Sequence, residues 1–489
     1  MLPSVPAWIF IILPGLLLQK ERMIEFTNTL SRRKEEFKPG DESRVSMYTC
    51  GPTVYNYAHI GNFRAIMAYD LVKRWLRDSG YNVLHVMNIT DVDDKTIRNA
   101  AASGIPLEEF TRTYTEAFFE DCKTLRILPA DKTPRATDNI PGMIDLVTVL
   151  IEKGHAYASR DGSVYFSIQS YDGYGKLSRL DTRDLKHGAR IAHDEYDKDS
   201  VSDFVLWKGW TEADGTVQWE SPWGKGRPGW HLECSVMAGK YLGDTIDIHM
   251  GGEDLVFPHH ENEIAQSEAA TGKPFVRYWL HNGYLLVDGK KMSKSMGNFY
   301  TLRDITDKGY SGREIRYHLL ATQYRQPFNF TFDGLHAARS AIQRLDDVRT
   351  GLDRVIAANP EGTVRPEIKN EIERARTGWR KALDDDLNIS PALGSLFDCV
   401  RQANRWLAEE TVSGTEALAM KQFLDETDKI LAIAGTDDAV PDEALTLMQE
   451  RQDARAGKDW TRADEIREKL ALMGFCVEDT AEGPRLKRL

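Results

Sequence analysis

The sequence predicts an α/β fold in which a parallel-sheet domain is interrupted by an insertion and followed by an α-helical bundle and a small C-terminal module. Three observations support this prediction. Two apolar strands flank an amphipathic helix between residues 45 and 89, as in a βαβ unit. Short β-like runs that contain five tryptophans occupy residues 157–230. After Gly334 the chain has only helical patterns until a polar linker near its end.

The first predicted strands and helix indicate where a ligand site would lie. Val45–Thr49 is predicted as a strand, and the turn residues Cys50-Gly51-Pro52 follow it. From Ile60 to Asp78 apolar residues recur at helical spacing, and Gly80 stands where a helix C-cap is favoured. Val83–Ile89 is predicted as a second buried strand. Parallel sheets bind ligands at the carboxyl ends of their strands, so the residues that follow these two strands are candidates for function.

Changes in residue composition and in hydrophobic pattern along the chain predict its domain organisation. The apolar run Trp8–Leu18 contains Pro14 and is shorter than the roughly 20 residues that span a bilayer. Basic residues follow the run instead of preceding it, unlike a signal peptide. The predicted parts are a non-native or dispensable extension (1–22), the α/β domain (23–334) with its insertion (about 140–225), a helical bundle (335–435) and a terminal module (438–489).

Composition narrows the class of protein. With 489 residues, 41% hydrophobic and 28% charged, the chain resembles a soluble globular protein of several domains. A net charge of −12 excludes a global basic field, so a nucleic-acid partner would need local basic surface. The five cysteines are too few and scattered for a disulfide framework and fit a reducing compartment. We expect no membrane partner.

The segment Pro52–Asn62 (PTVYNYAHIGN) lies between the first strand and the first helix. His59 and Gly61 fall where the helix begins, and there free backbone amides and the helix dipole favour an anion. Glycine would let a phosphate approach closely, and the imidazole could donate a hydrogen bond to a developing charge. Taken alone, the pattern also fits a capping or core histidine.

A second candidate segment, Gly289–Asn298, contains the sequence KMSKS. Lys291 and Lys294 are separated by small residues, with a glycine at each end of the segment. This pattern suits a mobile loop over a triphosphate, because lysine ammonium groups can follow charge during phosphoryl or nucleotidyl transfer. A solvated basic surface loop is the alternative, and spacing alone does not separate the two.

Cysteine, histidine and glutamate residues form a candidate metal site. Cys50 ends a predicted strand, and His259 and Glu263 are spaced i, i+4 on a predicted helix. With Cys234 they give two thiolates, one imidazole and one carboxylate, a plausible ligand set for Zn²⁺. His260 with Glu263 at i, i+3 is a rival pairing, and both cysteines could instead be core residues.

Taken together, HIGN and KMSKS resemble the class I aminoacyl-tRNA synthetases, which implies a Rossmann-type catalytic domain. Asn62 replaces the last histidine of the more familiar HIGH, and we expect its amide to donate a hydrogen bond to phosphate or ribose. Three further stretches resemble the cysteinyl-tRNA synthetase family: YTCGPTVY from Tyr48, GRPGWHLECS from Gly226 and GGEDLVFPHHENE from Gly251.

This resemblance implies a ligase that activates L-cysteine with ATP to cysteinyl-adenylate and transfers it to the 3′-terminal adenosine of tRNA(Cys). It assigns one Zn²⁺ per chain to Cys50, Cys234, His259 and Glu263, and the ion would bind the substrate thiolate and thereby reject serine. It also implies Mg²⁺ with ATP, no separate editing domain, a monomer and a cytoplasmic location.

The resemblance carries further roles to single positions. It implies a catalytic role for His59, Asn62, Lys291 and Lys294. It implies nucleotide binding for Gly61, Ser293, Lys294 and Ser295, and substrate binding for Thr90, Trp230 and Asp254. Core packing is the alternative for Trp230, and a turn role is the alternative for Asp254. Asp91, Asp93 and Asp94 look like a metal cluster, although near-adjacent carboxylates usually form a solvated cap.

The C-terminal half resembles the RNA-binding parts of the same family. The stretch LDDDLNISPAL from Leu383 resembles a helical bundle shared by several class I synthetases. The basic terminal module with Trp460 resembles the part that faces the anticodon, where aromatic and basic side chains suit unpaired bases. Two alternatives are a cysteine ligase of mycothiol synthesis, which acts on an amino sugar and should lack this module, and an inactive RNA-binding relative.

Overall fold

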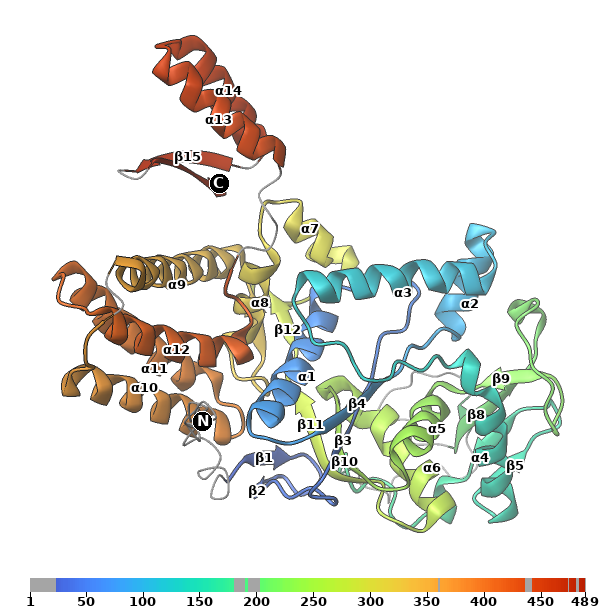
Figure 1. Cartoon of the computed structure of the whole chain (residues 1–489). Coiled ribbons are helices and arrows are strands. Elements are labelled where there is room, and N and C mark those ends of the chain that lie inside the picture. Colours follow the sequence, from blue (N-terminus) through green and yellow to red (C-terminus); the bar gives the residue numbers. More distant parts are fainter. Residues whose placement is uncertain are drawn as a thin grey trace, which may run out of the picture.

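The centre of the molecule is a four-stranded parallel sheet with the order β11-β10-β3-β4. The computed structural model describes residues 23–179, 190–191, 203–358, 361–435, 442–473, 475–480 and 483–488 (Figure 1). The sheet strands are Val276–Asn282, Ile246–Gly252, Val45–Thr49 and Val83–Met87, and each pairs in parallel with its neighbour. The predicted α/β class is confirmed. The predicted extension 1–22 lies outside the described residues.

Helix α1 connects β3 to β4 and has the predicted bounds, Ile60–Asp78. Its apolar face is buried at Phe63, Met67 and Trp75. Strand β4 ends at Met87, two residues before the predicted end, because Ile89 forms an isolated bridge with Arg135 and leaves the sheet. The βαβ unit is therefore as predicted except for its last two residues.

Helices and short strands surround this unit. Helices α2 (Asp94–Ser103) and α3 (Leu107–Thr124) follow β4, and α5 (Trp230–Leu242) and α6 (Glu261–Thr271) flank β10. Further elements of the first 330 residues are the hairpin β1 and β2 (Glu25–Asn28, Arg33–Glu36), the small sheet of β12, β13 and β14 (Leu285–Val287, Lys290–Lys291, Phe328–Phe330), and helices α7 and α8 (Leu302–Thr306, Gly312–Leu320).

The insertion is a separate small sheet that begins after helix α4 (Ile140–Glu152). Phe166, Phe204 and Trp207 are fully or almost fully buried in its core. The short tryptophan-containing runs predicted from the sequence thus form a second sheet with its own core. Its strands are β5 to β9: Ala156–Ala158, Val164–Phe166, Arg190–Ile191, Asp203–Gly209 and Gly226–Pro228.

The predicted helical bundle consists of α9 to α12: Phe332–Ala358, Pro366–Asp384, Ile389–Ala408 and Gly414–Leu431. Its apolar residues belong to the same buried cluster as α1 and the parallel sheet. The terminal module has its own small core, and Figure 1 shows it projecting from the rest of the chain. Its elements are α13, α14, β15 and β16: Asp442–Ala456, Trp460–Leu472, Phe475–Thr480 and Gly483–Arg488. Among the described helices, none is long and apolar enough to cross a bilayer.

A buried ion pair joins the sheet domain to the bundle. Asp70 on α1 accepts hydrogen bonds from Arg316 Nη2 at 2.6 Å and from Arg74 Nε at 2.7 Å. Arg74 also donates to the carbonyl of Lys429 near the end of α12, at 2.9 Å. Burial opposes the charge on Asp70, but the two guanidinium groups hold its pKa below the usual value. The pair therefore fixes α12 against α1.

Asp70→Asn should destabilise the chain by about 3–5 kcal/mol, because the buried charge of Arg316 loses its partner. Urea unfolding followed by circular dichroism measures this loss. Arg374→Ala is the matched control, since Arg374 is 63% exposed in its pair with Glu371, and it should cost about 1 kcal/mol or less. Equal losses in the two variants would contradict the role given to the buried pair.

Candidate active site and metal centre

A cleft of about 770 Å³ lies at the carboxyl ends of the parallel strands. The residues that follow β3 and β4 line it, as expected for a parallel sheet. Many of the predicted site residues meet here although they are far apart in sequence. They are Cys50, His59, Gly61, Asn62, Thr90, Trp230, Cys234, Asp254, His259 and Lys291.

His59 is the N-cap of α1. Its Nδ1 accepts a hydrogen bond from the Asn62 amide at 3.2 Å, and Asn62 Oδ1 accepts one from the His59 amide at 3.0 Å. Because Nδ1 is an acceptor here, we assign the proton of the neutral ring to Nε2. The capping alternative for His59 is therefore correct, and the same bonds leave the ring a donor in the cleft.

The capping box also explains the residues on either side of the helix start. The side-chain oxygen of Asn62 is engaged in the cap, a role that the sequence analysis did not assign to it. A Cβ at Gly61 would lie 2.9 Å from His59 Nδ1, so a larger residue would displace the imidazole. Gly61 thus protects the position of His59.

The two residues Tyr300 and Thr301, which follow closely after the KMSKS segment, contact the HIGN segment. The Ile60 amide donates to the carbonyl of Tyr300 at 3.0 Å, and His59 forms an isolated β-bridge with Thr301. Lys291 lines the cleft from β13. Within the KMSKS segment, Ser293 Oγ and Ser295 Oγ are 2.8 Å apart. The side chain of Lys294 lies outside the described residues.

The four predicted metal ligands come together in one buried cluster. Ligand atoms of Cys50, Cys234, His259 and Glu263 all lie within 4.8 Å of one another. His259 is not on the predicted helix: it lies in the irregular turn Val256–His260, and α6 begins after it. Its Nε2 is nevertheless 2.9 Å from Glu263 Oε1 and 3.5 Å from Cys234 Sγ.

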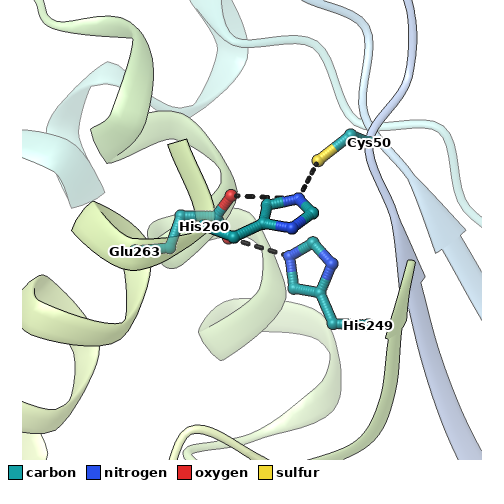
Figure 2. Close-up of side chains that lie close together, drawn as sticks. All are labelled: Cys50, His249, His260 and Glu263. Atoms are coloured by element: carbon teal, nitrogen blue, oxygen red, sulfur yellow. Dashed lines mark hydrogen bonds and ion pairs between the residues drawn. The ribbon is translucent and has the colours of Figure 1, made fainter. Parts of the chain in front are cut away.

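A second possible ligand set shares Cys50 and Glu263 and is completed by His249 and His260 (Figure 2). His260 Nε2 is 3.2 Å from Cys50 Sγ, and His249 Nε2 is 2.8 Å from Glu263 Oε2. The rival pairing of His260 with Glu263 is looser, at 4.0 Å. The structure therefore offers two overlapping metal sets.

The donor chemistry of this cluster fits a cation. Glu263 Oε1 is buried and receives no well-aligned hydrogen bond within the described chain. Burial also raises the pKa of both Cys50 and Cys234, so each remains a thiol unless positive charge is supplied beside it. A divalent metal would satisfy the carboxylate oxygen and favour the thiolates.

Three substrate candidates surround the cluster. The ring of Trp230 stacks on His259 with centroids 4.1 Å apart, so Trp230 forms part of the cleft wall. Thr90 donates to the buried carboxylate of Glu233 at 2.7 Å and receives a bond from Asn88 at 3.1 Å. Asp254 lines the same cleft.

The three near-adjacent aspartates have structural partners instead of forming one cluster. Asp93 caps α2 through the Thr96 amide at 2.7 Å. Asp91 pairs with Arg135 at 2.9 Å, and Asp94 pairs with Lys208 at 2.8 Å. The capping alternative is correct for Asp93, and ion pairs account for the other two carboxylates.

Several histidines beside the cluster were missed in the sequence analysis. His231 Nδ1 is 2.9 Å from His259 Nδ1, and His281 Nε2 is 2.7 Å from His260 Nδ1. With His249 they form a buried imidazole layer around the candidate ligands. One signal was available: residues 231–281 contain five of the chain's 12 histidines.

Two solved structures share the fold of this chain. A Mycobacterium tuberculosis methionyl-tRNA synthetase in complex with methionyl-adenylate has a TM-score of 0.59 at 16% identity, covering 80% of this chain and 90% of that one. An Agrobacterium radiobacter LeuRS in a ternary complex with tRNA and LeuAMS has a TM-score of 0.60 at 11% identity, covering 81% and 85%. The fold is that of the class I aminoacyl-tRNA synthetases.

Sequence comparisons identify the particular family. The model of the tRNA synthetases class I (C) catalytic domain matches residues 36–340, the DALR domain matches 378–434, and the cysteinyl-tRNA ligase anticodon binding domain matches 437–483. A cysteine–tRNA ligase of Chlamydia pneumoniae is 50% identical over 95% of this chain and 98% of its own length. One of Chlamydia caviae is 48% identical over 96% and 99%. The chain belongs to the cysteinyl-tRNA synthetase family.

Asn62→Leu should lower the free energy of unfolding by roughly 1 kcal/mol, because the His59 amide loses its bond to Asn62 Oδ1. Urea unfolding measures this change. Asn62→Asp is the control, since it retains an oxygen that can accept the His59 amide and should lose less stability. A smaller loss in the leucine variant than in the aspartate variant would contradict the capping role.

Proposed function

We propose that this chain, a ligase that joins cysteine to tRNA with ATP, selects its amino acid through a zinc ion held by Cys50, Cys234, His259 and Glu263. One observation carries the proposal: this buried cluster and the HIGN segment face the same cleft. Two sulfurs, one imidazole and one carboxylate form a typical ligand set for Zn²⁺. We propose one ion per chain.

Access favours this ligand set over the overlapping one. Cys50, Cys234 and His259 line the cleft, whereas His249 and His260 are not among its lining residues. An amino acid that enters the cleft can therefore reach the first set directly. Bound there, zinc would accept a thiolate far better than a serine hydroxyl, which is the chemistry that separates two nearly isosteric amino acids.

The other histidines would then orient the ligands. His231 bonds to Nδ1 of His259, which turns Nε2 toward Cys234 and Glu263. His249 bonds to Oε2 of Glu263 and leaves Oε1 facing the cluster. Such outer contacts fix the ring orientation and tautomer of metal ligands.

The remaining residues of the cleft suit activation of the amino acid carboxylate on the α-phosphate of ATP. The Nε2 proton of His59 and the ammonium groups of Lys291 and Lys294 would stabilise charge on the transferring phosphate. Gly61, Ser293 and Ser295 would contact the nucleotide, and Mg²⁺ would enter with ATP through its phosphate oxygens. Asn62 keeps its amide donor for phosphate or ribose while its oxygen serves the helix cap.

Thr90, Trp230 and Asp254 are proposed to hold cysteine beside this site. Trp230 would wall the pocket from its position on His259, and Asp254 would receive the amino group. The acid Glu233 holds the hydroxyl of Thr90 in place. Together these residues would orient the carboxylate toward the nucleotide.

The acceptor is tRNA(Cys), whose terminal adenosine would take the cysteinyl group on its 2′-hydroxyl. The match of residues 437–483 to an anticodon binding domain supports a tRNA acceptor, and nothing supports the amino-sugar alternative. The proposed domains are 23–334, with an insertion at about 140–225, 335–435 and 438–489. A monomer in the cytoplasm is proposed from the family resemblance.

Cys234→Ser should lose most of the bound zinc and most of the cysteine-dependent pyrophosphate exchange, because it removes a ligand that belongs to one set alone. Metal content is measured by atomic absorption and exchange with labelled pyrophosphate. Cys399→Ser is the control, since Cys399 is a buried cysteine of the bundle outside both sets. It should retain metal and exchange.

Full zinc content and an unchanged preference for cysteine over serine in Cys234→Ser would overturn the ligand assignment. In that case His249→Ala, which removes a ligand of the second set, should lose the metal. Removal of zinc from the wild type by a chelator should likewise reduce the preference for cysteine, and added Zn²⁺ should restore it.

Lys291→Ala should lower kcat of pyrophosphate exchange by about 10²–10³-fold, because a cation beside the developing phosphate charge is lost. The fold, zinc content and unfolding midpoint should not change, since Lys291 is exposed. Lys290→Ala is the matched control: Lys290 is the neighbouring exposed lysine and is not a lining residue of the cleft. A similar effect of both substitutions would argue for a general charge effect.

A further inference from the structure

Asn88 is a buried residue that links the candidate metal ligands to a substrate candidate. It follows strand β4, is 2% exposed and belongs to the residues that line the cleft. Its side chain reaches Gly51, which adjoins the candidate ligand Cys50, and it also reaches Cys234 and Thr90. One amide thus contacts both segments that carry the candidate sulfur ligands and the side chain proposed to bind cysteine.

The orientation of the Asn88 amide follows from its contact with Gly51. The backbone N–H of Gly51 can only donate, so the Asn88 atom 2.9 Å from it is the oxygen Oδ1. The same oxygen lies 3.8 Å from Cys234 Sγ, whose thiol is a weak donor. The amide nitrogen Nδ2 therefore faces Thr90 Oγ1, at 3.1 Å.

This orientation determines how the hydroxyl of Thr90 bonds. A hydroxyl group has one hydrogen and two acceptor lone pairs. Because the nitrogen of Asn88 donates, it uses one lone pair of Thr90 Oγ1, and the hydroxyl hydrogen must point elsewhere. Oxygen Oε2 of Glu233 accepts that hydrogen at 2.7 Å. The two bonds leave Thr90 one lone pair and no hydrogen for a ligand.

The amide is needed for the direction of this hydroxyl and not for the position of its backbone. The Val54 amide donates to the carbonyl of Thr90 at 3.1 Å, and the Thr90 amide donates to the carbonyl of Pro52 at 3.1 Å. These bonds hold the backbone of Thr90 beside the segment that follows β3, but its side chain could still rotate about one bond. The hydrogen bond from Asn88 restricts that rotation.

We propose that Asn88 is a positioning residue for the amino acid: its amide fixes the Thr90 hydroxyl as an acceptor for the ammonium group of cysteine. The inference rests on the proposed contact between Thr90 and cysteine. The thiolate would go to zinc and the carboxylate has no hydrogen to donate, so the ammonium group is the donor that suits this hydroxyl. Asp254 would receive another of its N–H bonds. The carboxylate is then directed toward the nucleotide.

Asn88→Leu tests this role, because leucine has a similar branched shape but cannot bond to Gly51 or Thr90. In the full-length, zinc-loaded chain it should raise KM for cysteine in pyrophosphate exchange about tenfold, the scale of a lost bond to a charged group. KM for ATP should change about twofold or less, since ATP does not depend on this hydroxyl. If the leucine variant does not fold, Asn88→Ala removes the same amide without added volume.

Asn139→Leu is the matched control. Asn139 is also 2% exposed, accepts a bond from Lys240 Nζ at 2.7 Å and donates one to the carbonyl of Arg135 at 2.7 Å. It does not belong to the residues that line the cleft. Its substitution should therefore leave both KM values unchanged, although it also removes a buried amide.

A double-mutant cycle shows whether Asn88 acts through Thr90. Thr90→Val removes the hydroxyl and keeps the shape of the side chain. In that background Asn88→Leu should raise KM for cysteine by about twofold or less, because the group that the amide positions is already absent. A purely structural role would instead add its full effect in both backgrounds.

Two thiol inhibitors identify the part of the substrate that is affected. Cysteamine carries the ammonium group without the carboxylate, and 3-mercaptopropionate carries the carboxylate without the ammonium group. In Asn88→Leu the inhibition constant of cysteamine should rise about tenfold, and that of 3-mercaptopropionate about twofold or less. Both compounds offer zinc the same thiol, so their difference does not depend on the metal.

Four results would overturn the inference. They are an unchanged KM for cysteine in Asn88→Leu, equal rises of KM for cysteine and ATP, an undiminished effect in the Thr90→Val background, and equal weakening of the two inhibitors. Loss of zinc from Asn88→Leu would likewise place its effect at the metal ligands. If Thr90→Val raises KM for cysteine and Asn88→Leu does not, only the role of Asn88 is wrong. An unchanged KM in Thr90→Val would contradict the proposed substrate contact itself, and the inference with it.

Discussion

The carboxylate of Glu263 is the group on which the site depends most. It is fully buried, and a carboxylate is costly in such a place unless positive charge or hydrogen bonds compensate it. Burial opposes its charge, yet His249 and His259 lower its pKa to about 2. The residue therefore stays ionised among thiols and imidazoles. An ionised oxygen facing two sulfurs favours a cation over any neutral packing.

The fold brings the partners of this carboxylate from separate elements. Cys50 follows β3, Cys234 lies on α5, and His259 belongs to the turn between β10 and α6. These residues come together at the carboxyl edge of the sheet, and the first turn of α1 lies at the same edge. Amino acid selection and phosphate chemistry can thus occupy adjoining parts of one cleft.

Local patterns predicted the elements better than the contacts between them. The apolar spacing of α1 gave its two ends, because capping and helical periodicity are local properties. The end of β4 was misplaced, since Ile89 leaves the sheet for Arg135, a contact that no local pattern contains. His249 and His231 were missed for the same reason: each acts through a residue on another element. The four proposed metal ligands came from family resemblance, whereas residue spacing alone did not decide between His259 and His260 as the partner of Glu263.

The chain on both sides of the KMSKS segment is bonded to other elements. Tyr300 and Thr301 are fastened to the start of α1, and the Gly289 amide is bonded to Asn329 Oδ1 at 2.7 Å. Gly289 and Gly297 both have positive φ angles, 74° and 67°, that side chains other than glycine rarely adopt. Between these glycines Lys290 and Lys291 are also paired with β12, so the segment is held on both sides. A rearrangement confined to residues 292–297 would therefore leave the reciprocal bonds between His59 and Asn62 intact.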